Sequence, residues 1–297
     1  MAIAVADASA ARFEGGIAER TLWAAIGHTR AFKRRWTDDT QMTLDTARSL
    51  VRCGAVDQDD LAREYAGNRR WSRGYGPAAA KTLRHIARGT SWRKARFARF
   101  PNGSFGNGAA MRVAPVALSS RDDQGAVIAG ATAVGEITHA HPLAIGGAIA
   151  VALAVHAAAR GDDAAATVEA SMHPSIGPEH RERLEVVRAW GVPGERPALR
   201  EVRRRLGNGM AAVESCATAI WLATASYDRS LTDLIRDAIG LRGDTDTIAA
   251  MAAGIWGARH GEAAVPQAEV ERTEAAEDVR TIASELAARF APGDADP

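Results

Sequence analysis

The segment from Pro142 to Ala159 limits the possible folds of this chain more than any other feature. Apart from His156 the segment is apolar, and Ala and Gly dominate it. A helix of this length could span a membrane. Its small residues and the histidines that flank it instead favour a helix buried on all sides by other parts of the protein. We therefore expect a buried helix here and no membrane partner.

The rest of the sequence also favours helices. Ala, Leu, Arg and Glu dominate it, and no run of Val, Ile, Thr and aromatic residues alternates strictly in the manner of a strand. This composition predicts an all-α fold class. The predicted helices run over Gln41 to Arg52, Asp59 to Gly67, Ala78 to Gly89, Gly106 to Leu118, Asp123 to Thr138, Leu143 to Arg160, Pro178 to Trp190, Leu199 to Leu206, Met210 to Ala225, Ser230 to Gly240, Thr247 to His260 and Thr273 to Phe290.

The length of 297 residues is near the upper limit for one hydrophobic core. Pro and Gly are spread along the chain without forming a long flexible linker, and 192–197 is predicted to be a surface loop. We predict a single domain over 1–297, with its core over about 1–262 and a C-terminal helix and frayed polar tail over about 263–297.

Charge and cysteine content exclude several classes of protein. The 37 Lys and Arg residues nearly balance the 36 Asp and Glu residues, so the net charge of +1 predicts no stable nucleic acid partner. Cys53 and Cys216 are too few for a disulfide framework and are expected to be buried apolar residues. Because Asp7 interrupts the first apolar run and no basic residue precedes it, we expect no signal peptide and a cytoplasmic location. We also expect a monomer.

Two acidic helix starts lie far apart in the chain. In the sequence Thr-Asp-Asp-Thr, Thr37 suits the N-cap, which places Asp38 and Asp39 in the first turn, where free N–H groups and the helix dipole favour negative charge. Alone, this pattern is ordinary capping. Gly243 to Thr247, Gly-Asp-Thr-Asp-Thr, repeats it before another predicted helix. If the two starts meet in the fold, four carboxylates and two hydroxyls gather in one place.

Such a cluster would need cations, because the repulsion between unneutralised carboxylates would raise their pKa values or drive them apart. All the candidate ligand atoms are hard oxygens, which selects Mg²⁺, Mn²⁺ or Ca²⁺ over zinc. Carboxylates that bridge could hold two ions, an arrangement that orients substrates rich in oxygen and activates water.

A glycine-rich segment from Asn102 to Gly108 is the third feature. Three glycines in six residues free the backbone to present successive N–H groups, and a predicted helix follows directly, so the segment suits a phosphate or pyrophosphate. It matches neither a P-loop nor a dinucleotide-binding fingerprint. Phe105 within it could stack on a base or ribose, or could equally anchor the loop in the core.

Five ordered motifs, which cover nearly the whole chain, together resemble the ADP-ribosylglycohydrolase family. They are Thr37 to Thr40, Gly106 to Pro115 (Gly-Asn-Gly-Ala-Ala-Met-Arg-Val-Ala-Pro), Thr138 to Pro142 (Thr-His-Ala-His-Pro), Leu206 to Ser215 (Leu-Gly-Asn-Gly-Met-Ala-Ala-Val-Glu-Ser) and Gly243 to Ala250. The resemblance implies a compact, orthogonal all-α fold. It also implies a centre of two Mg²⁺ or Mn²⁺ ions and hydrolysis of the bond between ADP-ribose and a modified protein side chain.

The resemblance assigns a role to each matching residue. The implied metal ligands are Thr37, Asp38, Asp39, Asp244, Asp246 and Thr247. The implied substrate-binding residues are Gly103, Ser104 and Gly106 for the diphosphate, Phe105 for the nucleoside, and His139, Gly209 and Met210 along the cleft. The implied catalytic residues are Asp38, Asp39 and Glu14. On the residues alone, His139 could equally be a satisfied interior histidine.

The first family signature matches less closely than the others. Ala6 to Glu14 resembles it and places Glu14 at the edge of the metal site, but Ala6 stands where the family has Gly. Only six residues precede Asp7, so we expect the segment that carries Glu14 to be lightly held. The Gly-Asn-Gly-Met loop that ends at Met210 resembles the branch that acts on O-linked, notably serine-linked, ADP-ribose more than the arginine branch.

The sequence therefore predicts a metal-dependent glycosidase that acts on an ADP-ribosylated protein or a small ADP-ribosyl conjugate and releases ADP-ribose. Asp38 or Asp39 would accept a proton from water, and Glu14 would assist as a ligand or as an acid and base. Two alternatives remain open. One is a reader that binds ADP-ribose without turnover, and the other is a two-metal phosphohydrolase that would release AMP.

Overall fold

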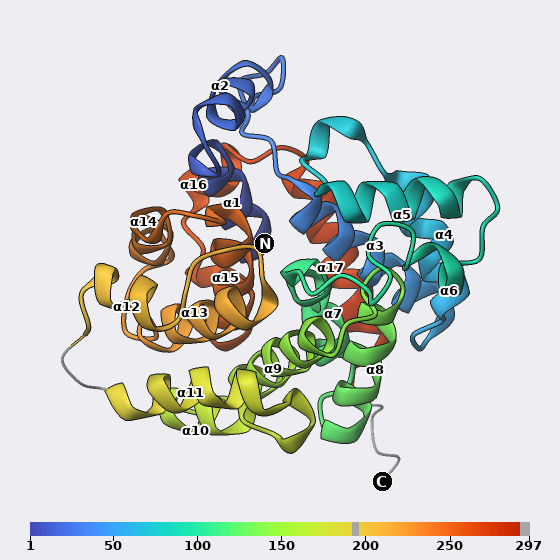
Figure 1. Ribbon diagram of the computed structural model, residues 1–297. Helices are drawn as coiled ribbons and strands as arrows, with labels where there is room; N and C mark the ends of the chain where they lie inside the picture. The colour runs from blue at the N-terminus through green and yellow to red at the C-terminus, as the bar shows by residue number, and fades with distance from the viewer. Residues whose placement is uncertain (192–195, 292–297) are drawn as a thin grey trace, which may run out of the picture.

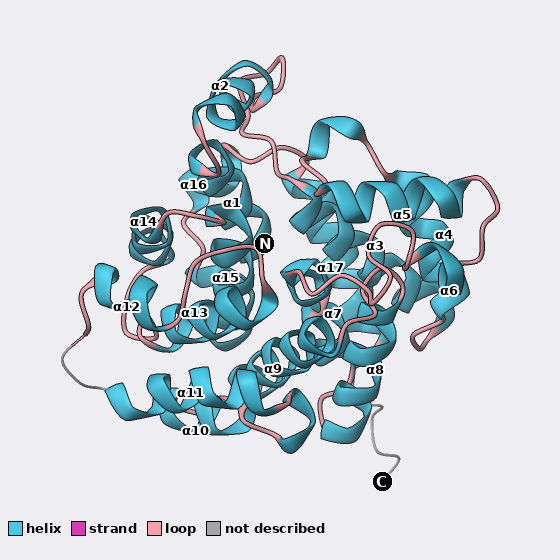
Figure 2. Ribbon diagram, viewed as in Figure 1, coloured by secondary structure: helices cyan, strands magenta, loops and turns pink. Residues whose placement is uncertain are grey.

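The computed structural model of the protein describes residues 1–191 and 196–291, and all regular structure in these residues is helical (Figure 1, Figure 2). The predicted all-α class is therefore confirmed. Most of the surface loop predicted over 192–197 and the tail over 292–297 lie outside the described residues.

The described residues form seventeen α-helices joined by loops and five short 3₁₀ helices. The α-helices are α1 (Ala2–Ala10), α2 (Ile17–Ile26), α3 (Asp38–Cys53), α4 (Gln58–Asn68), α5 (Pro77–Ala87), α6 (Trp92–Ala95), α7 (Ala114–Ser119), α8 (Gln124–Glu136), α9 (Pro142–Ala159), α10 (Ala164–Ser171), α11 (Pro178–Trp190), α12 (Leu199–Arg205), α13 (Ala212–Thr224), α14 (Leu231–Leu241), α15 (Thr245–His260), α16 (Gln267–Glu271) and α17 (Ala276–Arg289). The 3₁₀ helices are η1 (Ala11–Phe13), η2 (Trp71–Arg73), η3 (Asn107–Arg112), η4 (Pro174–Ile176) and η5 (Glu262–Ala264).

Five α-helices lie outside the predicted ranges: α1, α2, α6, α10 and α16. Helix α1 is built of small apolar residues around Asp7 and is buried on nearly all sides, so it lacks the one-sided apolar pattern of a surface helix. Helices α6 and α16 have only four and five residues, and α2 and α10 are short segments that follow glycine- or aspartate-rich turns. Short helices of this kind depend on packing more than on local sequence.

The single helix predicted over Gly106 to Leu118 is wrong. The chain instead forms η3 and then a separate helix, α7, in which Pro115 occupies the first turn. A proline lacks the N–H group that a continuous helix would need, so it suits the start of a new helix. The glycine-rich loop therefore leads into a tight 3₁₀ helix and not into the α-helix expected from the sequence.

Helix α9 lies at the centre of the molecule, as its apolar sequence predicted. It packs against α8, α10, α13 and α15 (Figure 1), and 78% of its residues are buried inside the protein. It is also the one described helix long and apolar enough to span a membrane. Its burial agrees with a helix surrounded by protein.

The two ends of the described chain both join this core. Helix α1 packs against α15, with Val5, Ala6 and Ala10 fully buried, so the segment before Glu14 is firmly held and the expectation of a lightly held segment is wrong. Helix α17 packs against α3, and its Leu286 belongs to the same hydrophobic core.

The two cysteines differ in environment. Cys216 is buried as expected, whereas Cys53 is exposed because it is the last residue of α3, just before the helix ends at Gly54.

Candidate functional site

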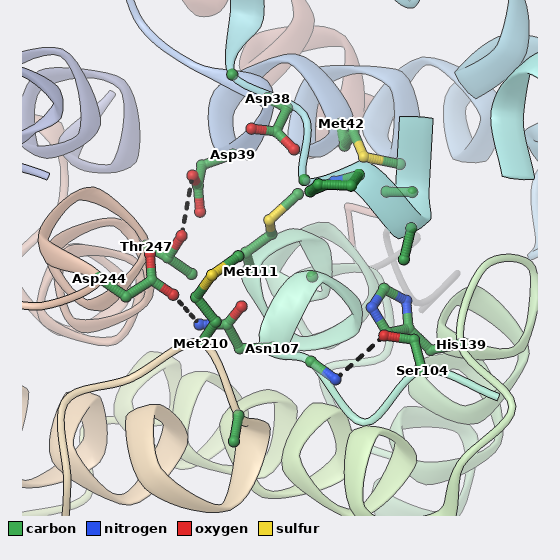
Figure 3. Close-up of a pocket in the computed structure, with 18 of the residues that line it drawn as sticks. Asp38, Asp39, Met42, Ser104, Asn107, Met111, His139, Met210, Asp244 and Thr247 are labelled. Carbon is green, nitrogen blue, oxygen red and sulfur yellow. Dashed lines mark hydrogen bonds between the residues drawn. The ribbon is translucent and has the colours of Figure 1, made fainter. Parts of the chain in front are cut away.

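One cavity of about 290 Å³ collects most of the residues that the sequence singled out (Figure 3). This volume lies at the lower end of the range of small-molecule sites. The predicted site residues that line it are Glu14, Asp38, Asp39, Ser104, Phe105, Gly106, His139, Met210, Asp244, Asp246 and Thr247. The carboxylates lie at one end of the cavity, and the glycine-rich loop and His139 lie at the other (Figure 3).

The two acidic helix starts meet at the carboxylate end. Thr37 is the N-cap of α3 as predicted, because its Oγ1 accepts a hydrogen bond from the Asp39 backbone N–H at 3.2 Å. Asp244 precedes the first turn of α15, where its side chain forms no cap bond. Instead, the Asn107 side-chain amide donates to Asp244 Oδ2 at 2.5 Å, which ties this helix start to the glycine-rich loop.

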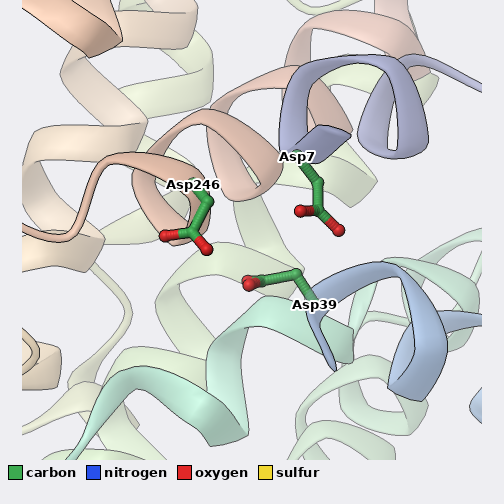
Figure 4. Close-up of side chains that lie close together, drawn as sticks. All are labelled: Asp7, Asp39 and Asp246. Atoms are coloured by element: carbon green, nitrogen blue, oxygen red, sulfur yellow. The ribbon is translucent and has the colours of Figure 1, made fainter. Parts of the chain in front are cut away.

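Two groups of three carboxylates have oxygens close enough to share a cation. Asp7, Asp39 and Asp246 each offer one oxygen, and these atoms all lie within 4.8 Å of one another (Figure 4). Glu14, Asp244 and Asp246 form a second such group. Asp246 belongs to both groups, which is the arrangement that a carboxylate bridging two ions requires.

Asp7 is the member of this cluster that the sequence did not identify as a site residue. It is fully buried and accepts hydrogen bonds from the backbone N–H groups of Thr37 and Thr40 and from the Thr40 hydroxyl at 2.5 Å. These bonds fasten the start of α3 to α1. A single charged residue within an otherwise apolar helix was the signal that could have revealed it, because a buried charge needs a specific partner.

Asp39 has one oxygen that is satisfied and one that is not. Its Oδ2 accepts hydrogen bonds from the hydroxyls of Thr37 at 2.9 Å and Thr247 at 3.2 Å. Its Oδ1 is buried without a hydrogen-bond partner among the described residues. A buried acceptor costs free energy if it is left unsatisfied, so the cluster contains an oxygen that is available to a ligand.

The protein by itself destabilises the charged form of this cluster. Burial first, and then neighbouring carboxylates, raise the pKa values of Asp38, Asp39 and Asp246 well above the usual range. Burial also raises the pKa of Asp7 to about 6, despite its hydrogen bonds to Thr37 and Thr40. Cations would relieve this repulsion. The unsatisfied Asp39 oxygen and the purely oxygen donor set fit hard divalent ions such as Mg²⁺.

Main-chain hydrogen bonds hold the other end of the cavity in register with the carboxylates. Asn107 N–H donates to Met210 O at 2.9 Å, and Ala212 N–H donates to Phe105 O at 3.0 Å. Asp244 N–H in turn donates to the Asn208 carbonyl at 2.9 Å. The glycine-rich loop, the loop that carries Met210 and the start of α15 therefore form one connected backbone unit.

The glycine-rich loop is shaped by its own side chains and by close packing. Ser104 Oγ accepts a hydrogen bond from the Gly106 N–H at 3.3 Å (Figure 3), and Phe105 is 49% exposed. Phe105 is therefore not a core anchor. At Gly103 φ is +81°, and an added Cβ would lie 2.7 Å from His141 N, so only glycine fits there.

His139 lies in the cavity wall, and its hydrogen bonds fix which ring nitrogen carries the proton. Arg112 Nη2 donates to Thr138 Oγ1 at 2.7 Å, and Thr138 Oγ1 lies 2.7 Å from His139 Nδ1. Arginine cannot accept, and the Thr138 hydroxyl has no other acceptor in the described part of the chain, so it donates to Nδ1. The proton of the neutral ring then sits on Nε2, which faces Gly106 and Gly108.

Burial and the Arg112 charge lower the pKa of His139 to about 3, so the ring stays neutral at physiological pH. Its Nε2–H is thus a fixed hydrogen-bond donor beside the glycine-rich loop. His139 is both of the things that the sequence left open: an interior histidine with its Nδ1 satisfied, and part of the cavity wall.

Three predicted residues do not line the cavity. Thr37 lies behind Asp39 and holds it through two hydrogen bonds. Gly103 packs against the His141 backbone, and an added Cβ at Gly209 would lie 2.5 Å from the Glu214 carboxylate. The residues that line the cavity without having been assigned a role in the sequence include Met42, Gly74, Pro77, Arg99, Phe100, Asn107 and Arg112.

The fold is all-α, and one cavity joins a carboxylate cluster that could hold cations to a glycine-rich loop. These features define a class of all-α proteins with a carboxylate-lined cavity. Within that class, the family model described as ADP-ribosylglycohydrolase matches residues 1–295, and the chain belongs to this family. The resemblance noted in the sequence is thereby confirmed.

Individual relatives agree with this assignment. The chain is 32% identical to ADP-ribosylhydrolase ARH3 of Bos taurus over 88% of this chain and 80% of that protein. It is 33% identical to ADP-ribosylhydrolase ARH3 of Xenopus tropicalis over 78% of this chain and 75% of that protein. A solved structure described as an ADP-ribosylglycohydrolase-related protein complex superposes with a TM-score of 0.72 at 26% identity, covering 97% of this chain and 95% of that chain.

Proposed function

We propose that the protein is a metal-dependent hydrolase that cleaves the glycosidic bond between ADP-ribose and a modified protein side chain or small conjugate. One observation carries the proposal: a single cavity joins the carboxylate cluster to a glycine-rich loop with an exposed Phe105. The first end suits a ribose held through cations, and the second suits a diphosphate and a nucleoside.

Different residues of the cavity would bind the diphosphate, the nucleoside and the metal ions. The backbone N–H groups of Phe105 and Gly108 and the Nε2–H of His139 would bind the diphosphate side. The Phe105 ring would stack on the nucleoside. Two bound Mg²⁺ or Mn²⁺ ions would supply Lewis-acid chemistry at the ribose and the attacking water. Asp38, which lines the cavity and belongs to neither group of three carboxylates, would accept the proton of that water.

Glu14 lies beside Asp244 and Asp246 and faces the same cavity. We assign it to the leaving group, as the acid that donates a proton to the acceptor oxygen, or to a ligand position. Carboxylates close to the sugar ring also stabilise the positive charge that develops at the anomeric carbon. The Gly-Asn-Gly-Met loop that ends at Met210 and the likeness to ADP-ribosylhydrolase ARH3 favour an O-linked, serine-type acceptor over arginine.

The test is incubation of the protein with serine-linked and arginine-linked ADP-ribosyl peptides, with Mg²⁺ or with EDTA, followed by mass spectrometry. We expect release of intact ADP-ribose from the serine-linked peptide only when Mg²⁺ is present. Preferential cleavage of the arginine-linked peptide would overturn the acceptor assignment. Release of AMP would identify a phosphohydrolase, and tight binding of ADP-ribose without any turnover would identify a reader.

A further inference from the structure

The near-neutral net charge of the protein conceals a strong local separation of charge. Residues 65–121 contain 12 Lys and Arg residues and no Asp or Glu. The rest of the chain holds the remaining 25 basic residues and all 36 acidic residues. This segment includes α5, α6 and the glycine-rich loop.

Two basic residues of α5 and its C-cap residue, Arg88, form a stripe along one face of the helix. Lys81, Arg84 and Arg88 follow Pro77 at spacings of four, seven and eleven residues, which places all four on the same side of the helix. The opposite side carries Thr82 and Leu83, which are buried. At 1.5 Å per residue, the stripe extends about 16 Å from Pro77, which itself lines the cavity.

Most cations on this surface lack an acidic partner. Acidic residues of neighbouring helices form ion pairs with two of these cations. Arg93 pairs with Asp59 of α4, and Arg96 lies 3.9 Å from Glu136 of α8. Five others form no ion pair with any described residue. They are Lys81, Arg84, Arg88, Lys94 and Arg99. Their charge is therefore available to an external anion.

Exposed aromatic rings lie among these cations. Phe97 and Phe100 are each 39% exposed. The Arg96 guanidinium lies 5.1 Å from the Phe97 ring centroid, and Arg99 lies 5.7 Å from that of Phe100. Helices α5 and α6 pack together (Figure 1), and Arg99 and Phe100 line the same cavity as Pro77. The start of the stripe and the Phe100 ring therefore both border the cavity, whereas the cations of the stripe and Phe97 lie outside its lining.

We infer that the α5–α6 surface, defined by Lys81, Arg84, Arg88, Lys94 and Phe97, binds single-stranded nucleic acid. Cations spaced along a track neutralise successive phosphates, and exposed aromatic rings stack on unpaired bases. A duplex hides the faces of its bases, so the exposed rings favour a single strand. The inference goes beyond the proposed hydrolysis and replaces the expectation, drawn from the net charge alone, of no nucleic acid partner.

The site lies next to the catalytic cavity and not inside it, because none of the five residues lines the cavity. Bound nucleic acid would therefore leave the carboxylate cluster open. Such a surface would hold the enzyme where nucleic acid is present, close to conjugates on proteins assembled there.

The test is fluorescence anisotropy with a labelled single-stranded oligonucleotide of about 16 nucleotides, the upper end of common site sizes. The variant is the triple substitution K81Q, R84Q and R88Q in the full chain. Removal of three phosphate contacts should lower the slope of log K against log salt by about 2 and weaken binding by about 10- to 100-fold at 0.1 M salt. A second variant, Phe97→Ala, should weaken binding to a single strand without a change in the salt slope.

A matched control removes the same charge elsewhere. Arg30, Arg160 and Arg200 are exposed and form no ion pair with a described residue, so R30Q, R160Q and R200Q together should leave the affinity nearly unchanged. Free ADP-ribose at saturation should not displace the oligonucleotide, and hydrolysis by the triple variant should stay at the wild-type rate. These two results separate this surface from the cavity, whether or not the proposed hydrolysis is correct.

Several outcomes would overturn the inference. They are an equal loss of affinity in the control variant, no binding by the wild-type protein in about 0.05 M salt, or tighter binding to a duplex than to the single strand. Binding to anionic lipid vesicles without binding to the oligonucleotide would assign the surface to a membrane instead.

Discussion

Both ends of the cavity contain buried polar groups, and the two ends satisfy these groups in opposite ways. At the His139 end, Arg112, Thr138 and His139 form a chain in which the Thr138 hydroxyl is used as both donor and acceptor. At the carboxylate end, burial and then the neighbouring carboxylates raise the pKa values of the carboxyl groups, and the Asp39 Oδ1 has no partner among the described residues. One end is complete within the protein, whereas the other needs ions from solution.

This difference indicates how each end contributes to function. A complete network is rigid and selects its ligand by shape and by the direction of its donors. Repulsion raises the electrostatic free energy of a cluster of carboxylates, and bound cations lower it again. Such a cluster therefore binds cations in preference to other ligands. Variants at the two ends should therefore fail in different ways.

The largest effect is expected at Asp246, the residue that belongs to both groups of three carboxylates. Asp246→Asn should abolish turnover, because this residue can bridge two ions, while the helical circular dichroism stays nearly unchanged. Loss of a charge at a helix start costs only about 0.3–1 kcal/mol. Asp38→Asn should behave in the same way. Asp278→Asn, which removes an exposed charge from the first turn of α17, is the matched control. Wild-type activity in Asp246→Asn would remove the two-ion site from consideration.

Glu14 should show the next largest effect. Because it faces the cavity from the segment after α1, Glu14→Ala should lower kcat by at least about 100-fold, the lower end for loss of a general acid or base. ADP-ribose affinity should change little. Parallel measurement of kcat and of ADP-ribose binding, with the exposed Glu277→Ala as control, checks this. An unchanged kcat would show that Glu14 takes no part in the reaction.

At the His139 end of the cavity, loss of a single hydrogen bond should have a moderate effect on ADP-ribose affinity. Thr138→Val removes the hydroxyl that fixes the His139 proton on Nε2, and ADP-ribose affinity should fall by about tenfold, or about 1.4 kcal/mol. Thr138→Ser keeps the hydroxyl and should restore binding. Nitrogen chemical shifts of the imidazole ring report the tautomer directly. Equal loss of affinity in the serine and valine variants would show that the hydroxyl does not act through His139.

Ligand binding should couple the two ends. ADP-ribose should raise the melting temperature by several degrees in Mg²⁺, since a ligand bound only by the folded state stabilises it by RT ln(1 + [L]/Kd). The shift should shrink in EDTA, because the carboxylate end then cannot hold the ribose. Thermal melts with and without Mg²⁺ measure it. An equal shift in EDTA would favour a reader that uses only the His139 end.

The smallest effect is a pH dependence of stability at Asp45, a buried carboxylate that does not line the cavity. Burial raises its pKa to about 7, although hydrogen bonds from Asn68 and Gln41 oppose the shift. A carboxyl whose pKa is higher in the folded state favours folding when protonated, so this contribution is lost as pH rises from about 4 to about 7. The side chain of the Asp45→Asn variant cannot ionise. The melting temperature of the variant minus that of the wild type should therefore increase between pH 5 and pH 8, as thermal melts across this range would show. A constant difference would contradict the raised pKa.

Much of the fold was predictable because its signals are local. The N-cap at Thr37 and the burial of α9 follow from residue types within a few positions of each other. The helices that the sequence missed are those with the least local information, such as α1, in which small residues give no one-sided pattern. The break before α7 is also a local effect, because Pro115 has no N–H group for a continuous helix.

The sequence by itself determined the chemistry of the site: paired acidic helix starts and a glycine-rich loop, whose properties depend on neighbours along the chain. Only the tertiary structure decided which groups meet. The packing of α1 against α15 brings Asp7 to Asp39 and Asp246, and the hydrogen bond from Asn107 to Asp244 joins the two ends of the cavity. Likewise, the sequence contained the charge separation of 65–121, but the helical periodicity of α5 set its cations on one face. Contacts between distant residues depend on how whole helices pack, and packing free energy is summed over many residues, so no single motif can reveal it.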